Sequence, residues 1–359
     1  MIDTTSSYTP SAALGTNRST DRSKCPVFVV GCHRSGTNLL YDTLLSAGGF
    51  AVYRGYLPVH KILIPRVGSL NKLENRRKAM DLWLRSKGFR RSGLDARKLT
   101  DQVLGQCRNG GDFIRLTMDE IARNQNVNRW AVYDPDALFH VQRIKADIPD
   151  ALFVHIIRDG RDIALSLNKM GGFMPFFWAR KPASVLSTAV YWEWTVRQGR
   201  RHGRQFPADY IEIHYEDLVR DPQQTLDTIG RFLDHDLDYA RIRQISLGRV
   251  SESNSSFREE PKETQESPVG RWKNRLSPAD IATLEALIGS CLEEVGYSLT
   301  SLPIDRKLSL RHRLLRVLYP AFLSSKVWLR TSTPVGRFVN LSALELENDA
   351  VAGQKSNAT

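Results

Sequence analysis

The feature that most constrains this chain is the stretch at residues 27–40, VFVVGCHRSGTNLL. Four apolar residues that favour β-structure come first, a turn from Gly31 to Gly36 follows, and the chain then enters a helix-forming segment. The N–H groups in the first turn of a helix have no intrahelical partner, and the helix dipole favours negative charge there. We therefore predict an anion-binding loop at this point of the chain.

The spacing of Gly31 and Gly36, with four residues between them, matches the first part of the P-loop pattern G-x-x-x-x-G-K-[ST]. Thr37 stands where that pattern has its lysine, and the positive charge comes instead from Arg34 inside the loop, with His33 beside it. This favours a ligand with a shorter 5′ anionic chain than a nucleoside triphosphate. The alternative interpretation is a tight strand-to-helix turn whose glycines serve only backbone geometry.

Predicted strands alternate with predicted helices along the rest of the chain. Strands are expected at 27–30, 50–53, 130–133, 151–157 and 209–214, and helices at 37–47, in several pieces of 70–129, and at 137–148, 184–202, 222–233 and 277–294. Residues 54–68 are predicted to be irregular. The nearly continuous apolar run 151–157 is typical of a strand buried on both faces of a parallel sheet. We therefore predict an α/β fold: a P-loop-like, doubly wound parallel sheet with helices on both faces and a C-terminal helical tail.

Four segments, in order, resemble those of bacterial-type sulfotransferases that use 3′-phosphoadenosine-5′-phosphosulfate (PAPS). GCHRSGTNLL resembles that family's loop for the 5′-phosphosulfate, and residues 153–166 (FVHIIRDGRDIALS) resemble its segment for the 3′-phosphate. Residues 215–218 (YEDL) and 270–274 (GRWKN) resemble the two further segments. The resemblance covers about residues 26–297, and it implies PAPS as co-substrate. We expect no metal ion, because a sulfuryl group bears less charge than a γ-phosphate and the loop lacks the lysine that accompanies Mg²⁺ sites.

The resemblance also implies which residues contact the nucleotide. They are His33, Arg34, Ser35, Gly36, Thr37 and Asn38 in the loop, Arg158 and Ser166 in the second segment, and Tyr215, Gly270, Arg271 and Trp272 in the last two. Arg34 and the loop would neutralise the sulfate and the leaving oxygen, whereas Arg158, Ser166 and Arg271 would hold the 3′-phosphate. Tyr215 and Trp272 would border the adenine. We expect Arg161 and Lys273 to be solvated surface charges.

The acceptor needs a general base, and the glutamate of the resembling pattern is replaced by Tyr56 in this chain. His60 is close in sequence and is of a residue type that titrates near neutrality. Asp134 follows a predicted strand, at the edge of the sheet where Arg158 is also expected. We rank His60 first and Asp134 second as the base, with Arg34 as the third catalytic residue.

The charge balance predicts anionic partners. The chain has 51 Lys and Arg against 39 Asp and Glu, a formal charge of +12, which suits a phosphorylated nucleotide, a polyanion or an acidic membrane surface. No zinc-finger, basic-zipper or RNA-recognition pattern occurs in the sequence, so we do not expect nucleic acid as a partner. The four scattered cysteines, the absence of a signal-peptide pattern and the absence of a long apolar run predict a cytoplasmic protein without a structural metal.

The chain divides into three predicted parts: a disordered lead at 1–24, the catalytic domain at 25–300, and a basic amphipathic extension at 301–359 with a disordered end. Within the extension, residues 307–340 mix apolar and basic residues at roughly helical spacing. They either dock on the domain, the simpler choice, or lie on an anionic membrane. We also expect the polar stretch 251–270 to close over the nucleotide and the aromatic loop 171–182 to contact the acceptor.

The predicted activity is in-line transfer of a sulfuryl group to a hydroxyl or amine of a carbohydrate, lipid or small metabolite. A P-loop nucleotide kinase and a non-catalytic nucleotide-binding protein of the same fold are the alternatives. No motif in the sequence specifies the acceptor or the oligomeric state.

Overall fold

A parallel sheet of five strands lies at the centre of the computed structural model, which describes residues 21–169, 184–251, 267–306 and 308–347. The strands are β1 (Val27–Val30), β2 (Phe50–Ala51), β3 (Arg129–Tyr133), β4 (Leu152–Ile157) and β5 (Tyr210–His214), in the order β2-β3-β1-β4-β5. All four pairings are parallel. After β1 the chain passes to the edge strand β2, returns inward to β3 beside β1, and then places β4 on the other side of β1. The carboxyl ends of β1 and β4 therefore meet at the switch point where such sheets bind ligands.

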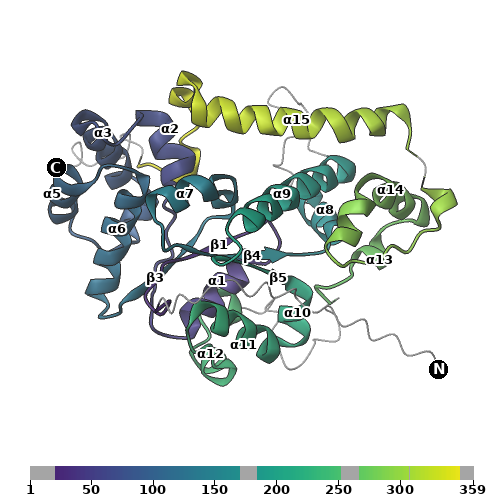
Figure 1. Cartoon of the computed structure of the whole chain (residues 1–359), viewed down its shortest axis with the longest axis horizontal. Helices are drawn as coiled ribbons and strands as arrows, with labels where there is room; N and C mark the ends of the chain where they lie inside the picture. Colours follow the sequence, from purple (N-terminus) through teal and green to yellow (C-terminus); the bar gives the residue numbers. More distant parts are fainter. Residues whose placement is uncertain (1–20, 170–183, 252–266, 307, 348–359) are drawn as a thin grey trace, which may run out of the picture.

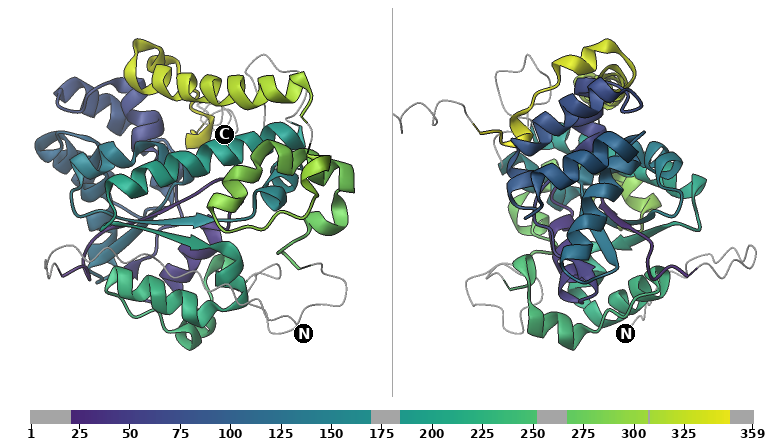
Figure 2. Two further views of the ribbon diagram at one scale, coloured as in Figure 1. Left: turned by 45° about the vertical axis from the view of Figure 1, so that its right-hand side comes forward. Right: turned by 90° about the vertical axis from the view of Figure 1, so that its left-hand side faces the viewer.

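Helices cover both faces of the sheet (Figures 1 and 2). One face carries α1 (Thr37–Ser46), α10 (Tyr215–Arg220), α11 (Pro222–Leu233) and α12 (Tyr239–Ile245). The other carries α6 (Gly110–Asn124), α7 (Val141–Asp147), α8 (Gly160–Lys169) and α9 (Val185–Gln205), and α14 (Pro278–Glu294) packs on α8 and α9. Outside these layers lie α3 (Leu73–Leu84), α4 (Lys87–Arg90), α5 (Ala96–Gln106) and α13 (Trp272–Arg275). The predicted doubly wound α/β fold is confirmed.

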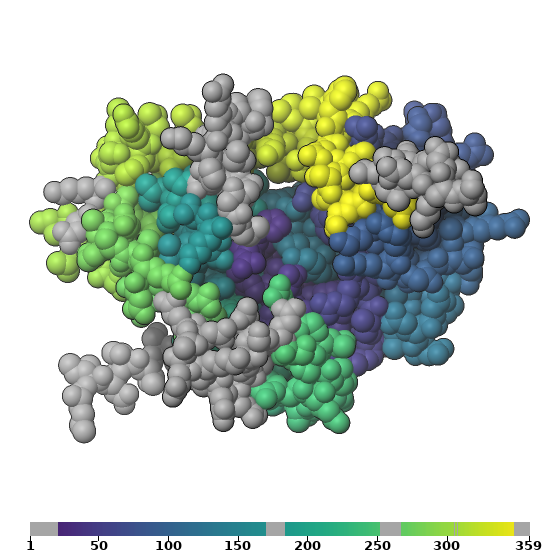
Figure 3. Space-filling view, turned by 180° about the vertical axis from the view of Figure 1, so that it is seen from behind, coloured from purple at the N-terminus to yellow at the C-terminus, as the bar shows by residue number. Residues whose placement is uncertain are grey.

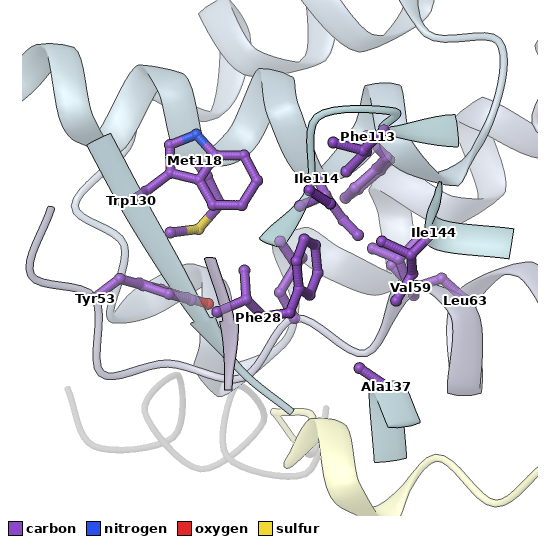
Figure 4. Close-up of a cluster of buried hydrophobic side chains, with 14 of the residues drawn as sticks. Phe28, Tyr53, Val59, Leu63, Phe113, Ile114, Met118, Trp130, Ala137 and Ile144 are labelled. Atoms are coloured by element: carbon purple, nitrogen blue, oxygen red, sulfur yellow. The ribbon is translucent and has the colours of Figure 1, made fainter. Parts of the chain in front are cut away.

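The side chains of β1 alternate between two cores. Val27 and Val29 face the cluster that includes α1 and α11, whereas Phe28 and Val30 face the cluster that includes α6. The ring of Phe28 stacks on that of Phe153 from β4 at a centroid distance of 5.3 Å. Figure 4 shows Phe28 among the side chains of this second cluster. Because β1 is buried on both faces, it holds the loop that follows it on a rigid base.

Two segments differ from the sequence-based expectation. Residues 54–68, predicted to be irregular, contain a π-helix, η1 (Val59–Leu63), followed by α2 (Ile64–Val67). Pro58 and Pro65 suggested a loop, but Pro65 occupies an N-terminal position of α2, where its missing N–H is tolerated. The single helix predicted at 137–148 begins instead as a 3-10 segment, η2 (Pro135–His140), before α7.

The C-terminal segment returns to the domain. Helix α15 (Leu310–Ser332) runs along α9 (Figures 1 and 2), and its Tyr319 and Leu323 are buried there. Two 3-10 turns follow, η5 (Pro334–Phe338) and η6 (Ser342–Leu344), and Leu344 joins the core that contains Phe28. One face of this helix is therefore docked on the domain. Within the described ranges, no helix has the length and apolar character needed to cross a bilayer.

Arg161 is buried at 2% exposure, so the expectation of a surface charge was wrong. Its guanidinium donates to Asp159 at 2.8 and 3.0 Å and to Glu285 of α14 at 2.6 Å. It also lies 3.8 Å from the centre of the Trp272 ring. This ion network joins the β4–α8 turn to α14 and to the segment that contains Trp272. The pairing with Glu285 could not be predicted from the sequence, because that residue is far away along the chain.

We predict that Glu285→Gln destabilises the fold at neutral pH by about 3 kcal/mol, because it removes one charge of a buried pair. Burial acts to raise the pKa of Glu285, but hydrogen bonds from Ser301 and Thr300 outweigh burial and lower the pKa to about 2 from the ordinary value of 4.5. The contribution is therefore complete above pH 4.5 and is lost as the pH falls toward about 2. Urea unfolding across this range tests it, with Glu293→Gln on the exposed side of the same helix as control. A constant difference at every pH would contradict it.

Candidate functional site

The loop between β1 and α1 is held in a conformation that both of its glycines make possible. A Cβ at Gly31 would stand 2.6 Å from the carbonyl oxygen of Ile156 in β4, and one at Gly36 would stand 2.4 Å from the ring of Tyr215. Gly36 has a φ of 97°, and Arg34 also lies in the left-handed region, with a φ of 73°. A non-glycine residue held there is strained by about 1–2 kcal/mol, a feature that clusters at ligand-binding sites. The glycines therefore serve close packing as well as the turn.

The start of α1 is open to an anion. Gly36 is the N-cap residue and supplies no side chain, so no capping group competes for the N–H groups of the first turn. Ser35 is fully buried beside it, and its hydroxyl oxygen has no hydrogen-bond partner among the described residues. A buried hydroxyl without a partner is costly, and a phosphate or sulfate oxygen would satisfy it.

The two predicted anion sites are contiguous. Nε of Arg34 donates to the hydroxyl of Ser166 on α8 at 3.0 Å, and a guanidinium nitrogen of Arg158 donates to the backbone carbonyl of Arg34 at 3.3 Å. The Arg158 guanidinium also lies 4.3 Å from the centre of the Tyr215 ring, and its Nε has no partner within the described parts of the chain. Residues far apart in the sequence thus meet at the carboxyl ends of β1 and β4. In Figure 3 the N-terminal part of the chain, in purple, reaches the surface in a recess between the two halves of the molecule.

The segment from residue 267 to 272 closes one side of this site. Arg158 donates to the carbonyl of Pro268, and the carboxylate of Asp162 accepts the N–H groups of Gly270 at 2.8 Å and Trp272 at 3.0 Å. Burial raises the pKa of Asp162, although the Arg158 charge and these N–H groups oppose the change. Sequence reasoning missed Asp162, although its place in the turn after Arg158 was a usable signal.

The last two predicted residues of this segment have different surroundings. Arg271 is exposed, and its Nε donates to the carbonyl of Ser267 at 2.9 Å. Trp272 is buried, and its indole N–H donates to Asp159 at 3.1 Å. Packing already accounts for Trp272, and its contact with adenine stays a prediction. The predicted closing loop falls largely on residues 252–266, and the predicted aromatic loop on 171–182; both lie outside the described residues.

A cluster of acidic residues follows β3 on the other side of the loop. Asp136 accepts a hydrogen bond from Lys61 and pairs with His33 at 3.7 Å, and Asp134 accepts the Tyr56 hydroxyl at 3.5 Å and the N–H of Asp136 at 3.0 Å. Burial and the neighbouring Asp136 charge raise the pKa of Asp134 to about 7. Burial acts in the same direction on Asp136, but His33 and Lys61 outweigh it and hold the pKa of Asp136 below its usual range. Of the two carboxyls, Asp134 is therefore the one that holds a proton more readily.

His60, ranked first as the base, lies deeper in the fold. It is 7% exposed, and a Cβ at Gly110 would stand 2.6 Å from its ring. The ring of His140 is 6.0 Å away, and burial together with the His140 charge lowers the pKa of His60 to about 3. Its base role stays a prediction, but this position makes Asp134 the stronger candidate.

A cavity of about 310 Å³ opens beside the acidic cluster. Asn38 of α1, Tyr56 and Tyr133 contribute to its wall, and so does Glu345 after η6. Four cationic and two acidic side chains line it, namely Arg54, Lys87, Arg91 and Arg249 with Asp42 and Glu345. No sequence motif predicts the part of the cavity wall that Glu345 forms. Glu345 reaches the cavity only because the C-terminal segment returns across α4.

Comparisons with known proteins agree with this geometry. The Sulfotransferase family profile matches residues 26–239, well over half of the chain. Protein-tyrosine sulfotransferase 1 of Danio rerio is 24% identical over 281 residues, which cover 76% of this chain and 72% of that protein. The structure of a sulfotransferase domain from the curacin biosynthetic pathway aligns with a TM-score of 0.53 at 17% identity, covering 76% of this chain and 98% of that domain, so the two share a fold. The chain described here belongs to the sulfotransferase family.

Proposed function

We propose that this sulfotransferase takes its sulfuryl group from PAPS and transfers it to a hydroxyl acceptor. The observation that carries the proposal is the contact between the two anion sites: Arg158 bonds the Arg34 carbonyl, and the Arg34 side chain bonds Ser166. One ligand with anionic groups at two points of an adenosine would bridge them. Arginine suits this role because its planar fork can bind a phosphate through two N–H groups.

Two buried polar atoms support the fit. The Ser35 hydroxyl and Nε of Arg158 both lack partners among the described residues, and each belongs to one of the two anion sites. A bound 5′-phosphosulfate and 3′-phosphate would supply acceptor oxygens to them. The loop has Thr37 in place of the P-loop lysine, so a triphosphate would lack its usual γ-phosphate contact. The nucleotide-kinase alternative gains no support from the site.

Sulfuryl transfer resembles phosphoryl transfer in that an anionic group moves in line between two oxygens, so a protein contributes mainly position and positive charge. The open N-terminus of α1 would stabilise charge on the leaving phosphate oxygen, together with Arg34. The side chain of His33, within the loop, pairs with Asp136 at 3.7 Å. These groups belong to β1 and its loop, which the double-sided core holds in place.

The acceptor would enter from the β3 side, through the cavity that Tyr56 and Tyr133 line. There Asp134 would accept the proton of the attacking hydroxyl, because it contacts Tyr56 at the cavity wall and releases its own proton near pH 7. The charged, polar lining favours an acceptor with several polar groups, such as a carbohydrate or small metabolite or the headgroup of a lipid. A tyrosine phenol, the acceptor that the name of the Danio rerio relative indicates, belongs in the same test panel.

Replacing Arg158 by alanine should weaken binding of adenosine 3′,5′-bisphosphate by about tenfold or more, because a charge-assisted contact to phosphate is lost. Titration calorimetry measures this directly, with Arg204→Ala, an exposed arginine of α9, as the matched control. ATP with Mg²⁺ should bind more weakly than the bisphosphate. Unchanged binding by the Arg158 variant would overturn the phosphate assignment.

Asp134→Asn should lower kcat/KM by about 10²–10⁴-fold at pH 8, since a general base contributes this much. In the wild type, kcat/KM should rise with pH around the pKa of about 7, because the carboxyl is protonated and inactive below it. The variant should lose that rise. The measurement is sulfate transfer across an acceptor panel at a series of pH values.

His60→Gln is the companion experiment. If Asp134 is the base, this variant keeps the rise near pH 7, although packing against Gly110 is disturbed. If His60 is the base, its pKa of about 3 places the rise far lower, and the Asp134 variant keeps most of its activity. A chain that binds the bisphosphate but transfers sulfate to no acceptor would instead support a non-catalytic binding protein.

A further inference from the structure

Helix α15 has two apolar faces, and among the residues that the structure describes, the domain covers one of them. The covered face contains Tyr319 and Leu323, which are 1% and 8% exposed against α9. Trp194 of α9 also donates its indole N–H to Ser324 at 3.0 Å. The position of the helix on the domain is therefore set by this side, and the opposite side is free to serve another purpose.

The opposite side carries a stripe of large apolar residues, here called the outer stripe. Its members are Leu310, Leu314, Val317, Leu318, Trp328 and Leu329, with exposed fractions from 41% to 73%. With 3.6 residues per turn, the spacings i, i+4, i+7, i+8, i+18 and i+19 place them within one third of the helix circumference, opposite Tyr319. Ala321 and Ser325 occupy this side between Leu318 and Trp328, so the stripe has a longer part at 310–318 and a shorter one at Trp328 and Leu329. Single exposed apolar residues are ordinary, but six large ones within one third of a helix surface mark an interaction surface.

The charge around the outer stripe has one sign. From Arg306 to Leu344 the sequence contains no Asp or Glu. It contains eight Lys and Arg residues: Arg306, Lys307, Arg311, Arg313, Arg316, Lys326, Arg330 and Arg337. Arg311 and Arg313 are exposed at the first turn of α15, on either side of Leu310. Arg306 instead lies 4.0 Å from Glu285 of α14, and the helical spacing places Arg316, Lys326 and Arg330 outside the side of α15 that carries the stripe. The exposed basic side chains beside the stripe are therefore Arg311 and Arg313, and there the surface combines apolar side chains with positive charge.

The combination of exposed apolar and basic side chains distinguishes between two binding partners for the outer stripe, a second copy of the chain and an anionic bilayer. A second copy of the chain, paired through the same face, would bring two basic segments of this kind together without an acidic residue of the segment to compensate. An anionic bilayer offers both partners at once, since its headgroups attract the arginines and its acyl boundary accepts the apolar stripe. Trp328 is also of the residue type that favours the membrane–water boundary.

From these observations we infer that the outer stripe of α15 and its flanking arginines form a docking surface for an anionic lipid bilayer. The helix lies in the plane of the interface, with Tyr319 and Leu323 holding the domain above it. The surface is separate from the nucleotide site, so the inference stands independently of the proposed donor and acceptor.

Sedimentation of the full chain with vesicles tests the inference. The chain should bind vesicles that mix phosphatidylglycerol with phosphatidylcholine, should bind phosphatidylcholine vesicles much less, and should lose binding as salt is raised. Val317→Glu and Trp328→Glu should each weaken vesicle binding by about fivefold or more, because a carboxylate then faces the headgroups. Ile245→Glu, at a 44% exposed position on α12, is the matched control and should bind as the wild type does.

The charge contribution has its own pair of variants. Arg311→Glu/Arg313→Glu should reduce binding to the anionic vesicles more strongly than Arg220→Glu/Arg231→Glu, which makes the same charge change on exposed positions of α10 and α11. Binding of adenosine 3′,5′-bisphosphate, unchanged in every variant, shows that each one is folded. If the two double variants weakened vesicle binding equally, binding would depend only on the net charge of the protein, and the inference would be wrong.

Light scattering after size-exclusion chromatography tests the alternative partner, a second copy of the chain. If the chain is a dimer in solution that Val317→Glu converts to a monomer, and anionic vesicles do not bind the wild type, then the stripe is an interface between copies and the inference is wrong. A mass that is the same for wild type and variant, together with vesicle binding lost in the variant, supports the bilayer.

Discussion

The site depends on one hydrogen bond, from the Arg158 guanidinium to the backbone carbonyl of Arg34. Arg34 turns that carbonyl toward β4 because its backbone lies in the left-handed region, and the glycines on either side leave room for the close packing of the loop. The same arginine then extends its side chain to Ser166 on α8. One strained residue thus links the loop after β1 to the turn after β4. This link is what brings the two predicted anion sites together.

The strand order places the predicted nucleotide contacts and the acidic pair on opposite sides of β1. β1 lies between β4, which leads to the predicted nucleotide contacts, and β3, which leads to Asp134 and Asp136. In the proposed function, donor and acceptor would approach the loop from opposite sides, as in-line transfer requires. Both carboxyls of the acidic pair are buried, but their pKa values change in opposite directions. Lys61 and His33 keep Asp136 charged, and the charge of Asp136 helps to hold the proton on Asp134. The charge of Asp136, held by this ion pair, in this way raises the pKa of Asp134 beside it.

The C-terminal segment connects the site to the surface. Its last described residues form one wall of the cavity through Glu345, and Leu344 is anchored in the central core. Its helix α15 is fixed on α9 by one face and presents the outer stripe on the other. A change at the outer surface of α15 and a change at the cavity wall therefore involve one continuous piece of chain. This links the docking surface to the side from which we expect the acceptor to enter.

Local sequence pattern was sufficient to predict the positions of the strands, of most helices and of the loop between β1 and α1. Apolar periodicity and the spacing of Gly31 and Gly36 are properties of neighbouring residues. It also placed Asp134 at the end of a strand. Tertiary structure alone decided that Arg161 is buried on Glu285, that Trp272 packs beneath it, that His60 lies against Gly110, and that Glu345 reaches the cavity. These facts depend on which distant residues a side chain meets. The burial and the neighbouring charges that set the pKa and hydrogen bonding of a side chain come from those contacts, and the order of residues alone does not specify them.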